Sequence, residues 1–215
     1  MTSQSVVWPQ LKRELVAILR GITPQDIESV VTVLLEEGFE AIEVPLNSPD
    51  PFLSIEKARK LAPSSVLIGA GTVLDVADVE RLHGVGGNLL VTPNTDPAVI
   101  GLAARLGMVS MPGAFTPTEA LAAVKAGASA IKFFPASVLG PSGIAAIKAI
   151  MPPHIPLGAV GGVGEHNFGD YLKAGARAFG IGTSLYKPGD KADGVKAKAN
   201  ALVAAYDAAV AAHKS

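Results

Sequence analysis

The stretch Ala130-Ile131-Lys132-Phe133-Phe134-Pro135 has the composition of a short buried strand that ends at a proline. Lys132 lies inside it. Burying an ammonium ion is costly unless the ion is paired or loses its proton. A lysine that loses its proton can attack a carbonyl and form a Schiff base. The alternative interpretation is a lysine at a strand end whose ammonium group reaches water, and this stretch alone is compatible with both.

Apolar runs of this kind recur along the chain about every 20 to 27 residues, which leaves room for one strand and one helix each. They are continuous rather than alternating, as expected for parallel strands that are covered on both faces. Eight such units predict a single closed (β/α)8 TIM barrel over residues 1–215, with residues 1–14 as an N-terminal leader segment. An open doubly wound sheet is the competing topology. The runs are Leu15–Arg20, Ala41–Pro45, Val66–Gly71, Asn88–Pro93, Met108–Pro112, Ala130–Pro135, Leu157–Gly161 and Ala178–Gly182.

Helical patterns lie between these runs, for example at Ile27–Leu35 and Ala120–Val124, and the alanine-rich tail Lys191–His213 predicts the last helix. Thr23-Pro24 and Thr116-Pro117 are typical of helix starts, because a capping hydroxyl precedes a proline. Several glycines stand just before the next strand, where a left-handed helix C-cap is expected. They are Gly38, Gly87, Gly107, Gly127 and Gly175.

The composition favours a globular protein of the cytoplasm. Hydrophobic residues make up 49% of the 215 residues and charged residues 17%, and the net charge of −1 gives no basic field for nucleic acid. The longest uncharged run, Ala149–Gly164, contains three prolines and four glycines, so we expect no membrane-spanning helix. The start of the chain lacks a signal-peptide pattern. The chain has no cysteine, which excludes disulfides and thiolate metal sites.

Three charged residues lie inside or at the ends of the apolar runs, namely Arg20, Glu43 and Lys132. A barrel of this kind builds its active site at the C-terminal ends of its strands, so the three are expected to converge. Glu43 is either a salt-bridge partner of Arg20 or Lys132, or a general acid/base with a shifted pKa. Arg20 is either that partner or a clamp for a substrate carboxylate. Their convergence favours the functional interpretation.

The last two strands are followed by glycine-rich segments, Val160-Gly161-Gly162-Val163-Gly164 and Gly180-Ile181-Gly182-Thr183-Ser184. Glycine lets backbone N–H groups approach an oxyanion, and the loops after strands seven and eight commonly hold phosphate in barrels. The alternative is that these glycines only form tight turns.

The sequence predicts neither a metal nor a cofactor. His83, His154, His166 and His213 are scattered without ligand spacing, and we expect His83 and His213 to lie on helices. No Walker-type or G-x-G-x-x-G nucleotide loop follows the first strand.

Several motifs together resemble those of the class I aldolases of 2-dehydro-3-deoxy-phosphosugar acids. The resemblance covers about Leu15 to Tyr206, and it is the combination that is specific. The motifs are Ala17-Ile18-Leu19-Arg20-Gly21, Ile42-Glu43-Val44-Pro45-Leu46, Ile68-Gly69-Ala70-Gly71-Thr72-Val73-Leu74, Val91-Thr92-Pro93-Asn94, Ile131-Lys132-Phe133-Phe134-Pro135 and Val160-Gly161-Gly162-Val163.

The resemblance implies a homotrimeric barrel that cleaves a six-carbon 2-keto-3-deoxy-6-phospho acid into pyruvate and glyceraldehyde 3-phosphate. It implies that Lys132 forms the Schiff base, that Glu43 moves protons and that Thr72 helps to hold the pyruvyl carboxylate. Pro93 and Phe134 would line the pocket. Val160 would lie beside the reacting carbons, and phosphate would be held by Gly161, Gly162, Gly182 and one of Thr183 and Ser184.

Two branches of this family use sugar acids that differ in configuration at C4. The phosphogluconate branch typically has arginine four residues after the glutamate and threonine before the glycine pair, where this chain has Asn47 and Val160. The segments Ile18–Gly21, Pro45–Ser48 and Ala159–Gly162 instead resemble the phosphogalactonate branch, whose substrate is 2-dehydro-3-deoxy-6-phosphogalactonate. Thr183-Ser184 departs from that branch. A phosphogluconate enzyme or one that acts on both epimers is the alternative.

Two other kinds of protein remain as alternatives. One is a different phosphate-binding barrel enzyme, such as an isomerase, an epimerase or a thiamine-phosphate-forming enzyme. These need no buried lysine on strand six. The other is a non-catalytic barrel that binds a sugar phosphate, and such a sensor gains nothing from a neutral lysine.

Overall fold

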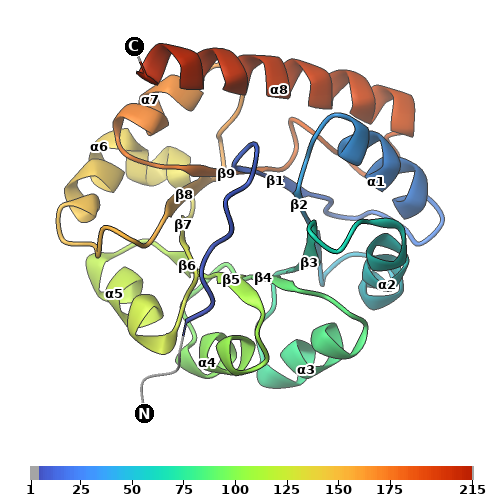
Figure 1. Cartoon of the computed structure of the whole chain (residues 1–215), viewed down its shortest axis with the longest axis horizontal. Coiled ribbons are helices and arrows are strands. Elements are labelled where there is room, and N and C mark those ends of the chain that lie inside the picture. The colour runs from blue at the N-terminus through green and yellow to red at the C-terminus, as the bar shows by residue number, and fades with distance from the viewer. Residues whose placement is uncertain (1–4, 215) are drawn as a thin grey trace.

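In a computed structural model, which describes residues 5–214, the apolar runs form parallel strands that close into a ring inside a layer of helices (Figure 1). Every strand pair is parallel, and neighbours follow chain order around the ring, from β5 through β4, β3, β2, β1, β9, β8 and β7 to β6. This order has no reversal, so the predicted barrel is confirmed and the doubly wound alternative is wrong. The strands are β1 (Leu15–Ile18), β2 (Ala41–Pro45), β3 (Leu67–Gly71), β4 (Leu89–Val91), β5 (Val109–Met111), β6 (Gly113–Ala114), β7 (Ile131–Phe133), β8 (Leu157–Val160) and β9 (Ala178–Ile181).

The described residues contain nine strand segments rather than eight because the fifth barrel strand is divided at Pro112: the predicted run, Met108–Pro112, covers β5 only, and β6 lies beyond it. Proline has no N–H to donate, so the ladder changes partner at this residue. β5 pairs with β4, β6 pairs with β7, and Lys132 N donates to Pro112 O at 2.9 Å. The division therefore leaves the barrel closed.

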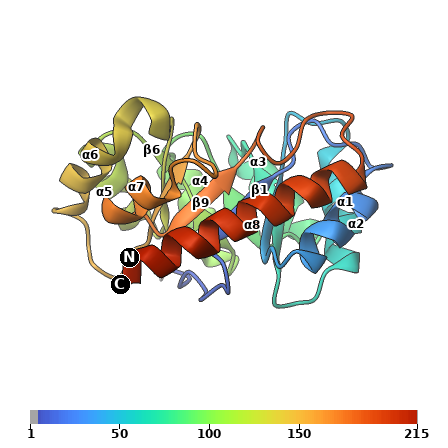
Figure 2. The ribbon, with the colours of Figure 1, turned by 90° about the horizontal axis from the view of Figure 1, so that it is seen from above.

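Helices follow the strands and cover the outside of the barrel. Figure 2 shows α8 running along one side of the molecule, where it packs against α1 and α7. Among residues 5–214, no helix is long and apolar enough to cross a membrane. The helices are α1 (Ile27–Glu36), α2 (Pro51–Leu61), α3 (Val76–Gly84), α4 (Pro97–Arg105), α5 (Pro117–Ala126), α6 (Ala136–Lys148), α7 (Phe168–Lys173) and α8 (Ala192–Lys214).

The predicted helix starts and ends are right in part. Thr116 and Glu119 form a reciprocal capping box at the start of α5. The expected start at Thr23-Pro24 is wrong: α1 begins at Ile27, because Thr23 Oγ1 donates to Asp26 instead of capping a backbone N–H. Four of the five C-cap glycines have positive φ, whereas Gly86, with φ +82°, takes the place expected for Gly87.

Two apolar cores share the strands, because successive side chains of a strand point to opposite faces. One core fills the space between barrel and helices, where Phe168, Phe179 and Tyr206 meet edge to face at centroid distances of 5.1 to 6.0 Å. The other fills the barrel interior. Trp8 and Leu11 belong to it, so the chain before β1 crosses and closes one end of the barrel (Figure 1). The opposite end stays open for a site.

Candidate active site

The residues that the sequence singled out come from many strand ends and line one cavity of about 680 Å³. Glu43 and Lys132 lie within β2 and β7, and Arg20 follows β1. The cavity lies at the C-terminal ends of the strands, as expected for a barrel enzyme. The structure thus brings together Arg20, Glu43, Thr72, Pro93, Lys132, Phe134, Val160, Gly161, Gly162, Gly182, Thr183 and Ser184.

Both neighbours of Lys132 in the sheet register are glycines. Gly113 of β6 and Gly158 of β8 are its Cα partners, and neither carries a side chain on the shared face. The lysine is 7% exposed, and Nζ lies 4.9 Å from the centroid of the Phe134 ring. The apolar strand therefore holds its amine at the inner end of the cavity.

Burial lowers the pKa of Lys132, and the positive charge of Arg20 lowers it further, while Glu43 acts in the opposite direction. Desolvation is the largest of these effects because the charged ammonium loses its hydration in the barrel. A lowered pKa raises the fraction of free amine, the form that attacks a carbonyl.

The carboxyl group of Glu43 lies in the same interior and is 2% exposed. Desolvation raises its pKa to about 7, against the opposing effects of Lys132, Arg20 and the Gly71 backbone. Among residues 5–214, no ion pair within 4.0 Å includes Glu43, so the salt-bridge interpretation is wrong. Its Oε2 has no hydrogen-bond partner within the described chain. A carboxyl group with this pKa can exchange protons near neutral pH.

Gly71 makes the position of this carboxyl group possible. A Cβ built on Gly71 would lie 2.2 Å from Glu43 Oε2, so only glycine leaves this space. The glycine is the last residue of β3, beside the strand that carries Glu43.

Arg20 lies at the mouth of the cavity and contacts the loop after β2. Its Nη1 donates to Asn47 Oδ1 at 2.5 Å, and the next residue, Gly21, donates its N–H to Ser48 Oγ at 2.9 Å. The arginine therefore pairs with an amide and keeps further N–H donors for a ligand.

Thr72 follows β3 with a left-handed backbone, φ +58°, which is unusual for a β-branched residue. Such strain persists where the surrounding structure imposes it, and it clusters at ligand sites. Thr72 and Glu43 line the same cavity.

The glycine-rich loop after β8 is braced by Asn167. Its Oδ1 accepts from the Gly164 N–H at 3.0 Å, and its Nδ2 donates to Gly162 O at 2.8 Å. Gly161 and Gly162 both have positive φ, +90° and +76°. The loop is thus a fixed, backbone-lined wall that suits an anion.

Six further residues, none of them predicted individually as a site residue, also line the cavity. His166 is the most informative of them. A Cβ built on Gly164 would lie 4.0 Å from the His166 ring and 3.8 Å from Ser184 Oγ. The two side chains therefore flank the same loop. The position of His166 in a loop gives no periodic signal in the sequence, and it has no metal-ligand spacing that would mark it. Within residues 5–214, no group of three or more His, Asp or Glu residues could hold a metal ion. The six are Ile18, Val163, Gly164, Glu165, His166 and Gly180.

The cavity combines a buried lysine with a lowered pKa and a carboxyl group with a pKa of about 7. It also holds an exposed arginine and a backbone-lined glycine loop. This combination suits imine chemistry on a phosphorylated keto acid. Comparison with known proteins supports the same chemistry. A family model described as "KDPG and KHG aldolase" matches residues 10–199.

Relatives of known name match nearly the whole chain. A probable 2-dehydro-3-deoxy-6-phosphogalactonate aldolase of Rhizobium meliloti is 64% identical over 93% of this chain and 94% of its own length. The 2-dehydro-3-deoxy-6-phosphogalactonate aldolase of Escherichia coli is 43% identical over 94% of this chain and 98% of its own. A solved structure described as "Native KDPGal structure" superposes with a TM-score of 0.92 at 43% identity, covering 95% of this chain and 99% of that one. The chain therefore belongs to the KDPG and KHG aldolase family.

Proposed function

We propose that the chain is a class I aldolase that cleaves 2-dehydro-3-deoxy-6-phosphogalactonate into pyruvate and glyceraldehyde 3-phosphate. One observation carries the proposal: Lys132, with a lowered pKa, shares the barrel interior with Glu43, whose pKa is about 7. The assignment of this substrate is supported by the two relatives that carry its name, which are 64% and 43% identical to this chain.

The reaction begins when the neutral amine of Lys132 attacks the C2 carbonyl of the substrate. Loss of water gives a protonated imine, which accepts electrons from the C3–C4 bond as that bond breaks. Glu43 takes the proton from the C4 hydroxyl, so the aldehyde leaves and an enamine remains on Lys132. Glu43 then returns a proton to C3, and hydrolysis of the imine releases pyruvate.

The two ends of the substrate are bound by different parts of the cavity. Arg20 and Thr72 hold the carboxylate, for which the guanidinium offers paired N–H donors. Phosphate binds between the braced loop, at Gly161 and Gly162, and the segment after β9, where Gly182 lies and Thr183 or Ser184 supplies a hydroxyl. Binding of this distant phosphate holds the reacting carbons in line.

The choice of C4 epimer is supported by Val160 and Asn47, which differ from the residues typical of phosphogluconate enzymes. Val160 is 5% exposed at the end of β8 and packs over Gly180, where a Cβ would lie 2.7 Å from its Cγ2. It offers the substrate no hydroxyl. An enzyme that accepts both epimers is the second candidate.

The resemblance to this family also supports a homotrimer, and the composition supports a cytoplasmic location. Sedimentation of the purified protein tests the trimer.

The deciding experiment is an assay of both epimeric phospho-acids, with release of pyruvate as the readout. Cleavage of the phosphogalactonate compound at the higher kcat/KM supports the proposal. Preference for the phosphogluconate compound would assign the other branch. No pyruvate from either compound, with phosphate-dependent binding intact, would support the sugar-phosphate sensor.

A further inference from the structure

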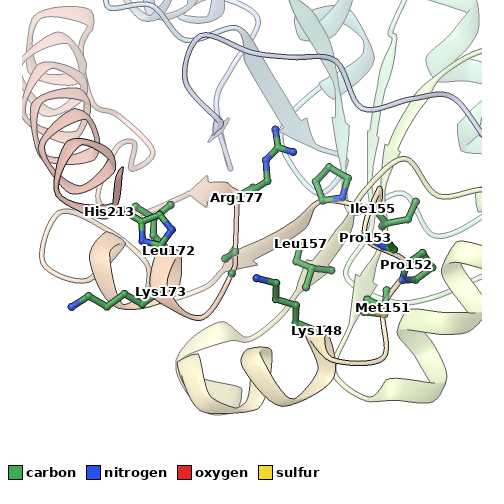
Figure 3. Close-up of a pocket in the computed structure, with 13 residues that line it drawn as sticks. Lys148, Met151, Pro152, Pro153, Ile155, Leu157, Leu172, Lys173, Arg177 and His213 are labelled. Carbon is green, nitrogen blue, oxygen red and sulfur yellow. The ribbon is translucent and has the colours of Figure 1, made fainter. Parts of the chain in front are cut away.

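We propose a second ligand site, for a small oxyanion with an apolar body, at the end of the barrel opposite the candidate active site. A cavity of about 430 Å³ opens there, where α6, α7 and α8 end (Figure 3). We call it the basic pocket, after its four basic lining residues: Lys148, Lys173, Arg177 and His213. It shares no lining residue with the active-site cavity.

The lining of the basic pocket contains four basic side chains and no carboxylate. Arg177 pairs with Glu14 at 3.1 Å, outside the pocket lining. Within the described chain, neither Lys148 nor Lys173 has a carboxylate within 4.0 Å. A bound oxyanion would supply the negative charge that this lining lacks.

Lys148 occupies the centre of this arrangement. Figure 3 shows its side chain extending across the pocket, whereas Lys173 points outward at the rim. A Cβ on Gly175 would lie 2.3 Å from Lys148 Nζ, so the lysine crosses this glycine closely. Gly175 also has φ +92°, a conformation that other residues rarely adopt. The backbone before β9 thus leaves space for the ammonium group inside the pocket.

The remaining wall is apolar. Met151, Ile155, Leu157 and Leu172 are each at most 9% exposed, and they line the pocket together with three prolines. A volume of about 430 Å³ falls within the range of small-molecule sites. Cations beside an apolar wall suit an organic phosphate or carboxylate better than a bare inorganic ion.

A simpler explanation of the lysines is that cations near helix C-termini interact favourably with the helix dipole. Lys148 and Lys173 lie in the last turns of α6 and α7. Lys125 has the same place in α5 but lines neither this pocket nor the active-site cavity. Lys125 is therefore a matched control. Both explanations give it the same interaction with a helix dipole as Lys148, but only the ligand-site explanation predicts that replacing Lys148, and not Lys125, weakens ligand binding.

Phenyl phosphate, an oxyanion with a compact apolar body, is a suitable probe. We would titrate it into the isotopically labelled full chain and follow the backbone amide shifts by NMR. We expect saturable shifts at Gly175 and Ala176, separate from any at Gly161 and Gly162. Lys148→Gln should raise the Kd for the binding event seen at Gly175 and Ala176 about tenfold, the usual effect of losing one charge-assisted hydrogen bond.

In the same experiment Lys125→Gln should change neither binding event, and Lys148→Gln should leave turnover unchanged. His213→Gln is a second test, because it removes the imidazole from the opposite wall and should also weaken the event at Gly175. The amide spectra themselves report whether each variant is folded. Absence of saturable shifts at Gly175 and Ala176 in the wild type, or equal weakening by Lys148→Gln and Lys125→Gln, would overturn the proposal.

Discussion

Arg20 donates a hydrogen bond from Nη1 to Asn47 Oδ1 at 2.5 Å, and this contact joins the loop after β1 to the loop after β2 at the mouth of the cavity. Asn47 stands where phosphogluconate aldolases typically carry the carboxylate-binding arginine. In this chain the arginine, Arg20, follows β1, and Asn47 accepts a hydrogen bond from it. If Arg20 holds the substrate carboxylate as proposed, we expect Asn47 to act on that binding indirectly, by orienting the guanidinium.

We expect Asn47→Ala to raise KM for the keto acid several-fold and to change kcat less, because the guanidinium loses an orienting acceptor. The test is a double-mutant cycle with Arg20→Met. If Asn47 acts through Arg20, Asn47→Ala will have no further effect in the Arg20→Met background. Additive losses would mean that Asn47 contacts the substrate independently.

Lys132 should form the imine. It is the one lysine placed within a strand in the described part of the chain, and burial lowers its pKa. Treatment with pyruvate and borohydride should leave a reduced adduct that peptide mass mapping locates at Lys132. Lys132→Arg should fold and lack turnover, because a guanidinium stays protonated. An adduct on another lysine would contradict the assignment.

Replacing Glu43 by glutamine should lower kcat by about two to four orders of magnitude, the usual range for a lost general acid/base. In the wild type, kcat/KM should fall as the pH drops below about 7, because protonation of Glu43 removes the base. Rates of both proteins across pH 5 to 9 check this, and the acid limb at that pH should be absent from any residual activity of Glu43→Gln.

The raised pKa of Glu43 also predicts how this residue affects the stability of the fold. Its folded pKa of about 7 lies above the ordinary value of 4.5, so its favourable contribution is complete below pH 4.5 and is lost as the pH rises through 7. At pH 8 ionised Glu43 should therefore lower the free energy of unfolding of the wild type by roughly 3 kcal/mol, a loss that a glutamine at this position avoids. Denaturant unfolding should show Glu43→Gln to be more stable at pH 8 and nearly equal at pH 5. Lower stability at both pH values would indicate a structural role.

His166 should contribute to phosphate binding, because its ring and Ser184 flank the loop at Gly164. We expect His166→Ala to raise KM for the phosphorylated substrate several-fold. Trapping of pyruvate by borohydride should be unaffected, since pyruvate carries no phosphate. Equal losses in both assays would show that His166 supports the loop and does not contact phosphate.

The barrel could be predicted because its signals are local. Continuous apolar runs at regular spacing indicate parallel strands, and the capping box at Thr116 marks a helix start that the structure contains. The errors arise where two local solutions compete. Thr23 could cap a helix or bond to Asp26, and Gly86 and Gly87 could both end α3. The division of the fifth strand depends on the partner of each half, which sequence does not show.

The site was predictable to the extent that charge within an apolar strand is unusual. Glu43 and Lys132 were identified for that reason, and both lie in the barrel interior. The sequence did not identify Asn47 as the partner of Arg20, because this contact depends on the directions of side chains from two different loops. Asn167 was missed for a similar reason: its bonds to the glycine loop arise only once the loop is folded.

Val160 should decide the C4 epimer. It ends β8 directly before Gly161 and lines the cavity, where it is 5% exposed. A threonine there would offer a hydroxyl to one orientation of the C4 oxygen, whereas valine has the same shape and no hydrogen-bonding group. A site hydroxyl without its partner costs about 1 to 3 kcal/mol, so this one atom can bias the epimers by roughly tenfold or more. We expect the wild type to prefer phosphogalactonate.

Val160→Thr should shift the ratio of kcat/KM values toward phosphogluconate. The hydroxyl is added at a nearly enclosed position beside Gly180, so the variant should fold with little change in volume. Measuring kcat/KM for both epimers in both proteins gives the ratio directly, and Val163→Thr, in the loop of the same cavity but beyond the glycine pair, serves as the control. If the ratio is unchanged in Val160→Thr, the contact that discriminates C4 must come from another wall of the cavity, and the Arg20–Asn47 pair at the mouth becomes the next place to test.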